Sequence, residues 1–205
     1  MKKKAMALVL ALGLVTVGIV GGTMAWLTAQ ATEVKNVFTG SDINITLTET
    51  GLNQNNENSY KMIPGHTITK DPVVKVDANS EPCYLFVQVT ENLGAWADSN
   101  KSFKDYLSYE IADGWTPLAE HSGVYYQKVA SPASAPKDGY AVLKDNKVTV
   151  SGDVTKEMMD EIDDQGEAKP TLTFQAAAVQ LYKTQGAEFT VAEAYDEVVW
   201  PAGNS

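Results

Sequence analysis

The side chains best suited to acid–base or metal chemistry are scarce in this sequence. His66 and His121 are its two histidines, and Cys83 is its one cysteine. Neither histidine stands in an H-E-x-x-H pattern or near a second nitrogen or thiol ligand, so we expect both in turns or loops and predict no zinc site. Cys83 can form no intrachain disulfide, and no His or Lys flanks it. The stretch PCYLFVQV therefore predicts a buried thiol on a strand.

A second candidate is the acidic stretch DEIDDQG, from Asp160 to Gly166. It does not fit a calcium-binding EF-hand loop, because Ile162 occupies the third position and no Glu stands at the twelfth. We interpret it as the solvated face of a helix, and a loose calcium site from scattered carboxylates stays an alternative. The sequence contains no G-x-S-x-G, Walker A or Rossmann glycine motif. It therefore predicts no enzymatic site and no cofactor.

Aromatic side chains offer a different chemistry, that of a binding groove. A set of them could line a carbohydrate or peptide groove, or could pack in the core and at its rim: Trp96, Trp115, Tyr125, Tyr126 and Trp200. Packing is the interpretation we favour, because large aromatic side chains supply much of the core of a domain of this size.

Composition restricts the class of partner. The chain has 205 residues, 44% of them apolar, which is enough for one domain with a substantial core. All sixteen basic residues are lysines, set against twenty-six acids, for a formal net charge of −10. We do not expect so acidic a chain to bind nucleic acid, because phosphate binding needs clustered Lys and Arg.

The N-terminus has the order of a secretory signal. Three lysines at 2–4 precede the apolar run AMALVLALGLVTVGIV, and small residues follow at 21–25. This order predicts cleavage between Ala25 and Trp26. A retained anchor is the alternative, because residues 5–27 are long enough to span a bilayer, but no basic stop-transfer cluster follows them. Cleavage would take away three lysines and no acid, which changes the net charge to −13.

Alternating hydrophobicity then predicts a series of strands. DINITLTE places Ile43, Ile45 and Leu47 on one face, and DPVVKVDAN does the same for Val74 and Val76. A polar loop at 51–60 and a turn at Pro64–Gly65 separate these two stretches. CYLFVQV is apolar on both faces, as in a central strand.

The middle of the chain, 94–140, is less regular. We expect a short helical piece near 103–107, strand-like pieces at 109–111 and 124–129, and a Pro/Ser/Ala linker at 131–136.

The last third mixes strands and helices. YAVLKDNKVTVSG predicts a hairpin that turns at Asp145–Asn146. Thr155 is positioned to cap a helix, KEMMDEIDD, whose Met158, Met159 and Ile162 share a face.

The stretch TLTFQAAAVQLY, 171–182, predicts a second central strand. Its apolar parity shifts from Leu172, Phe174, Ala176 and Ala178 to Val179 and Leu181, as a β-bulge would produce.

A closing helix is expected after a capping box formed by Thr190 and Glu193. Phe189 and Ala194 have the spacing of a hydrophobic staple, and Val191, Tyr195 and Val198 lie along one face. Many short strands with few, late helices indicate a mainly β fold, an antiparallel β-sandwich with short helices.

Several stretches also resemble a known family. KKKAMALVLALGLVTVGIVGGTMAWLT and the following VKNVFTGSDINITLTET resemble the SipW-type signal region and first strand of the TasA/camelysin family of exported Gram-positive proteins. YKMIPGHTITKDPVVKV, CYLFVQV and YAVLKDNKVTVSGDVT are similar to the same group. The resemblance implies cleavage by a dedicated signal peptidase and a jelly-roll-like β-sandwich. It also implies assembly into biofilm matrix fibres, in which each new N-terminal segment completes the next subunit's sheet. Some relatives were described as metallopeptidases, but this sequence lacks the histidine ligands for that activity.

The segment after the expected cleavage site fits this implication in outline. In WLTAQATEVKNVF, Leu27, Ala29 and Ala31 share one face before Glu33 interrupts the pattern, and Val34, Val37 and Phe38 follow. These apolar residues form a candidate donor strand for an exposed sheet edge. A flexible tether, or the domain's own first strand, is the alternative interpretation.

The resulting division is a signal peptide at 1–25, a mature arm at 26–40, a β-sandwich at 41–200 and a polar tail at 201–205. Our first hypothesis is a secreted, non-enzymatic subunit of extracellular or cell-surface matrix fibres. Its expected partners are other copies of itself, a signal peptidase during export, and other matrix proteins. The second hypothesis is a monomeric surface-binding module that uses the aromatic middle segment. The third is a camelysin-like metallopeptidase.

Overall fold

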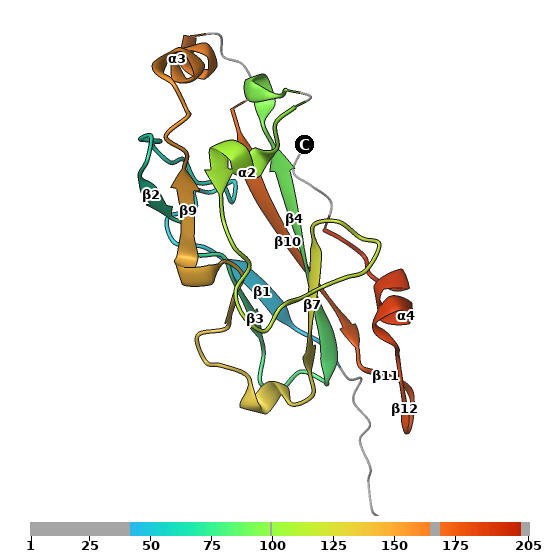
Figure 1. The fold of residues 1–205 in the computed structure, drawn as a ribbon. Coiled ribbons are helices and arrows are strands. Elements are labelled where there is room, and N and C mark those ends of the chain that lie inside the picture. The colour runs from blue at the N-terminus through green and yellow to red at the C-terminus, as the bar shows by residue number, and fades with distance from the viewer. Residues whose placement is uncertain (1–41, 99, 165–168, 202–205) are drawn as a thin grey trace, which may run out of the picture. The chain divides into compact units, whose positions relative to one another are not determined.

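The computed structural model describes residues 42–98, 100–164 and 169–201 (Figure 1). The predicted signal peptide with its Ala25–Trp26 cleavage site and the predicted arm at 26–40 lie outside the described residues, as does the tail after Pro201. The described part is mainly β, built from antiparallel sheets with a few short helices. The predicted fold class is confirmed at that level.

The largest sheet has four strands in the order β10-β4-β7-β6. Its two long members, β4 and β10, run side by side over ten residues each (Figure 1). The bounds are β4 Cys83–Asn92, β6 Thr116–Pro117, β7 Val124–Val129 and β10 Thr171–Gln180. The predictions of a central strand at 83–89 and of a strand at 124–129 are confirmed.

Two three-stranded sheets and one hairpin make up the remaining β structure. The sheets have the orders β1-β3-β8 and β2-β9-β5, and β11 pairs with β12. The bounds are β1 Ile45–Thr48, β2 Thr67–Thr69, β3 Val73–Val76, β5 Leu107–Ser108, β8 Tyr140–Ala141, β9 Lys147–Val150, β11 Tyr182–Thr184 and β12 Ala187–Glu188. The strands predicted within 42–49 and 71–79 are present as β1 and β3, with Val74 buried and Lys75 exposed.

The helices of the described residues are short; the three α-helices follow their predicted positions, whereas the three 3₁₀ helices were not predicted. They are α2 Phe103–Tyr106, α3 Lys156–Asp164, α4 Val191–Asp196 and the 3₁₀ helices η1 Gly94–Trp96, η2 Pro132–Ser134 and η3 Lys144–Asn146. Thr155 caps α3, since its hydroxyl accepts the N–H of Met158 at 3.3 Å, and Ile162 is buried. Among the described residues, no helix is both long and apolar enough to cross a bilayer.

The four-stranded sheet carries a hydrophobic cluster on each face. On β4, Cys83, Leu85, Val87 and Val89 belong to the larger cluster, which also receives side chains from β3, β7 and β9. Tyr84 and Phe86 point to the opposite face, into a smaller cluster with Leu181 and α4 residue Ala194. Because both faces are covered, β4 is apolar at consecutive positions.

The predicted β-bulge in 171–182 is wrong. All ten residues of β10 pair with β4 in one continuous register, from Thr171 opposite Asn92 to Gln180 opposite Cys83. Phe174 packs against the larger cluster, whereas Val179 packs against the smaller one. The apparent shift of parity arises because different clusters cover the two faces of one regular strand.

Two other predictions are corrected by the way the strands pair. The turn at Asp145–Asn146 exists, with φ of 54° at both residues. It closes no hairpin, however, because β8 pairs with β3 whereas β9 pairs with β2 and β5. The strand expected at 109–111 is reduced to a single bridge between Ile111 and Leu143, and the nearby strand is β5, at 107–108.

Candidate functional site

The outer edge of β10 is the longest unpaired strand edge in the described part of the chain. β10 was predicted to be a central strand, but it lies at the end of its sheet, so that prediction is wrong. The Leu181 N–H donates to the Pro82 carbonyl at 2.8 Å, which fixes the side of β10 that faces β4. Successive residues of a strand point their N–H and C=O groups to opposite sides. The outer edge therefore presents the backbone groups of Leu172, Phe174, Ala176, Ala178 and Gln180.

Nothing in the sequence of β10 discourages another strand from pairing with this edge. Its ten residues, TLTFQAAAVQ, include no charged residue and no proline. Natural sheets commonly protect an exposed edge with lysine, proline, a bulge or a very short strand. β10 has none of these protections, so its edge is chemically ready to accept a strand.

The apolar row on β10 is also incompletely covered. Leu172, Phe174, Ala176 and Ala178 are only partly buried, although they pack against the larger cluster. The corresponding row on β4 is buried almost completely, with Leu85 and Val87 at 0% exposure. A strand added beside β10 would bury more of this row, and apolar burial contributes roughly 25 cal/mol for each Å².

A buried polar cluster fixes the middle of β10 relative to β1. Lys70 Nζ lies 2.9 Å from Glu49 Oε2 and 5.3 Å from the centre of the Phe174 ring. The side chains of Glu49 and Lys70 are only 8% and 12% exposed. The Tyr60 hydroxyl donates to Glu49, and burial together with that carboxylate raises the pKa of Tyr60. This cluster connects the end of β1 to the larger-cluster face of β10.

Helix α4 covers the opposite face of β4 and β10, and its start is as predicted. Thr190 Oγ1 accepts the Glu193 N–H at 3.3 Å, and Glu193 Oε2 accepts the Thr190 N–H at 2.8 Å, which completes the capping box. The hydrogen bond from Lys183 and those from Thr190 lower the pKa of Glu193 to about 2. Ala194 is fully buried in the smaller cluster, so α4 covers part of this face of the sheet.

The residues considered for metal or nucleophilic chemistry do not come together. His66 is exposed at its turn, and His121 is an exposed loop residue whose ring lies 4.3 Å from that of Tyr195. No group of three or more His, Cys, Asp or Glu side chains suited to a metal occurs among the described residues. Cys83 is fully buried, and burial raises the pKa of its thiol to about 11. In the acidic stretch, residues 160–164 are helical, and Asp160 pairs with Lys156.

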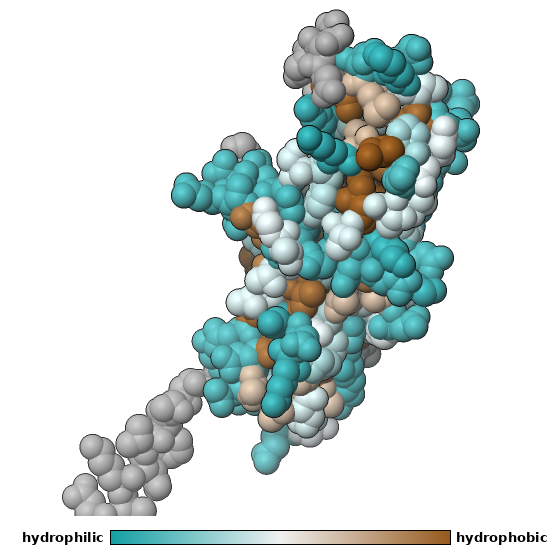
Figure 2. All heavy atoms as spheres, turned by 90° about the vertical axis from the view of Figure 1, so that its left-hand side faces the viewer, coloured by the Kyte–Doolittle hydropathy of each residue, from teal (hydrophilic) through white to brown (hydrophobic). Residues whose placement is uncertain are grey.

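The aromatic candidates do not form a groove. Trp96 and Trp115 are buried at 4% and 7% exposure in the larger cluster, and their indole N–H groups donate to the carbonyls of Met158 and Ala141, both at 2.8 Å. Tyr126 and Trp200 pack against the smaller cluster on the other face. The predicted packing role is confirmed for the two buried tryptophans. Seen from the β2 and β9 side, the surface is mostly hydrophilic, with one contiguous apolar patch in the upper part and smaller ones below it (Figure 2).

Comparisons of the chain with known protein families, with curated proteins and with solved structures found no match. Two features of this site were not predicted from the sequence. The lack of charge in 171–180 was visible in the sequence, and it could have indicated an accepting edge. The Glu49–Lys70 pair joins residues twenty-one positions apart, and no local pattern marks it.

Proposed function

We propose that this protein is a secreted structural subunit of extracellular matrix fibres. Each subunit donates the arm at 26–40 as a strand to the outer edge of β10 in the next subunit. The observation that carries the proposal is that edge, ten residues long with neither charge nor proline. Strand addition uses backbone hydrogen bonds for affinity and alternating side chains for specificity.

The chemistry of the arm suits this edge. Leu27, Ala29 and Ala31 alternate with polar residues, and Val34, Val37 and Phe38 extend the apolar content. In the register that we propose, these side chains add to the partly buried row of Leu172, Phe174 and Ala176. The completed fold would be the jelly-roll-like sandwich that the resemblance to the TasA/camelysin family implies. The signal-like N-terminus supports export, and cleavage at Ala25–Trp26 would free the arm.

The test compares a protein that begins at Trp26 with one that begins at Asp42. We expect long oligomers from the first and monomers from the second, measured by multi-angle light scattering and by electron microscopy. Thermal unfolding of the shorter protein controls for loss of the fold. Equal oligomer distributions from two folded proteins would remove the donor-strand mechanism. N-terminal sequencing of protein recovered from culture medium tests the cleavage site separately.

A further inference from the structure

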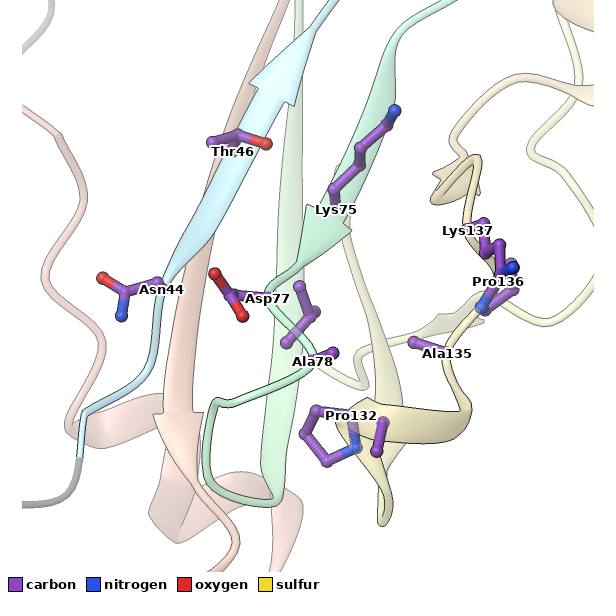
Figure 3. Close-up of a pocket in the computed structure, with 11 residues that line it drawn as sticks. Asn44, Thr46, Lys75, Asp77, Ala78, Pro132, Ala135, Pro136 and Lys137 are labelled. Carbon is purple, nitrogen blue, oxygen red and sulfur yellow. The ribbon is translucent and has the colours of Figure 1, made fainter.

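A groove of about 440 Å³ lies on the other side of the β1-β3 pair from the features described so far (Figure 3). Thr46 of β1 and Lys75 and Asp77 of the β3 segment line one part of it. The segment with Pro132, Pro136 and Lys137 lines the part that faces them. Its volume lies in the range typical of small-ligand and peptide sites.

The groove exists because β8 pairs with only the first half of β3 and the chain then turns away. β8 pairs only with Val73 and Val74. At Gly139 the chain approaches β3 so closely that a Cβ would lie 2.6 Å from Val73 Cγ1 and 2.7 Å from Lys75 Cγ. Gly139 has a φ of +85°, and its N–H donates to the Pro136 carbonyl at 2.9 Å, so the chain turns away there. Only glycine combines this close approach with this turn.

The early departure of β8 leaves Val76 with unused backbone groups. The Asp77 N–H donates to the Asn44 carbonyl of the β1 segment at 2.9 Å, so residue 77 faces β1. Since N–H and C=O directions alternate along a strand, those of Val76 face the other way, toward the groove that Val76 lines. No hydrogen bond between described residues satisfies them. The groove therefore offers one donor and one acceptor in strand geometry.

Positive side chains outnumber negative ones in the lining of the groove, although the chain as a whole is acidic. Lys75 and Lys137 both line it, and neither has a carboxylate within 4.0 Å among the described residues. The one acid in the lining, Asp77, already accepts the Asn79 N–H at 2.9 Å. Six other lysines of the described chain are paired with Asp or Glu. Two unpaired cations beside an open strand edge would attract a negatively charged extended segment.

We propose that this groove binds an acidic peptide of another protein, one residue of which pairs through its backbone with Val76. The central residue of the peptide exchanges backbone hydrogen bonds with Val76. Because Gly139 already occupies the position opposite Lys75, the peptide pairs with β3 at Val76 alone. Its carboxylates approach Lys75 and Lys137 along the wall with Pro132 and Pro136. This interaction surface is separate from the edge of β10, and the proposal does not depend on strand donation by the arm.

The test is a titration of the ¹⁵N-labelled protein with the blocked peptide Ac-Thr-Glu-Val-Glu-Thr-NH₂, followed by ¹H–¹⁵N NMR. We expect saturable shifts of the Val76 and Lys137 amides. Lys75→Gln and Lys137→Gln should each weaken binding roughly two- to five-fold, as expected for an exposed charge pair. Lys101→Gln is the matched control, because Lys101 is also unpaired among the described residues but lies outside the groove. It should leave the affinity unchanged.

Two further peptides examine the mode of binding. N-methylation of the central valine removes one backbone hydrogen bond and should weaken binding about two- to ten-fold. The peptide Ac-Thr-Lys-Val-Lys-Thr-NH₂ should not bind. Equal affinity for the lysine peptide, or an absence of shifts at Val76, would overturn the proposal. Nuclear Overhauser contacts between the Val76 amide and residues 26–41 of this chain or a second copy would also overturn it, because this protein itself would then fill the groove.

Discussion

The two outer edges of the four-stranded sheet are built in opposite ways. At one end, β6 has only two residues, Thr116 and Pro117. The Leu118 N–H donates to the Val124 carbonyl at 2.9 Å, so residue 117 directs its backbone away from β7, toward the open side. Proline at that position has no N–H to offer. At the other end, β10 presents ten uncharged residues without proline.

The difference shows that one sheet can be closed to strand pairing on one side and open on the other. Protection at β6 costs little, because its side chains are exposed and few contacts depend on them. At β10, a charge could have been placed at the exposed residues Thr171, Thr173 and Gln180 without disturbing a cluster. The absence of both charge and proline over ten residues is the main physical support for the proposed assembly through this edge.

The largest expected effect comes from closing the open edge. Ala176→Pro removes an outward N–H of β10 and adds a ring on the accepting side, so we expect assembly to be abolished while the monomer still folds. Light scattering measures the first outcome and circular dichroism the second. Ala177→Pro is the matched contrast: residue 177 faces β4, so that change should destabilise the monomer instead. Normal fibres from Ala176→Pro would contradict the role assigned to β10.

A smaller effect, on the free energy of unfolding, should distinguish the buried apolar row of β4 from the partly buried row of β10. Leu85→Ala removes a side chain with no exposure and should lower the free energy of unfolding by about 3 kcal/mol. Leu172→Ala, on the partly buried row of β10, should cost about 1 kcal/mol in the monomer. Urea unfolding measures both. A cost at Leu172 as large as that at Leu85 would show that the row on β10 is already fully covered in the monomer.

Variants of helix α4 test the contribution of the face of the sheet separately from that of its edge. Thr190→Ala removes the cap and should cost about 1 kcal/mol of stability without changing the oligomer distribution, because α4 packs against the smaller cluster on the face of the sheet. The carboxyl of Glu193 has a folded-state pKa of about 2, below its unfolded value of about 4.3. Its ionised form therefore stabilises the folded protein fully at pH values above about 4.3. This stabilisation is lost as the pH falls from about 4.3 toward 2. Glu193→Gln should flatten this part of the pH dependence of the melting temperature.

The smallest effect is expected at the protected edge. Pro117→Ala restores an outward N–H on β6, but a two-residue strand with exposed side chains provides little for a partner to bind. We expect no change in fibre length and a change in stability within about 0.5 kcal/mol. Sedimentation velocity of the variant measures the first. Sheet-edge association through β6 would show that proline alone keeps that side closed.

Much of the local structure was predictable because its signals are local. The capping box of Thr190 and Glu193, the helix after Thr155 and the alternation in β1 and β3 depend on residues a few positions apart, and all are present. Pairing was less predictable. The turn at Asp145–Asn146 was predicted correctly, but the sheets joined by the flanking strands were not, because strand partners are chosen over the whole fold.

β10 illustrates the same limit at the candidate site. A strand that is apolar on both faces has the same sequence whether it lies in the centre of a sheet or at its edge, provided that both faces are covered. Here the two faces of β10 pack, in part, against the larger and the smaller cluster, which made the strand resemble a central one. The absence of charge was a usable signal for an accepting edge, but only once the position of the strand was known.

The amino-acid sequence by itself determined an acidic, mainly β protein with a signal-like N-terminus, a buried cysteine and short capped helices. These properties follow from composition and from contacts between near neighbours in the chain. Only the tertiary structure decided that β10 lies at an edge, that Glu49 and Lys70 meet beneath the loop after β1, and that Val76 faces an open groove. Backbone groups are the same at every residue, so which of them stay unpaired depends on where distant strands end.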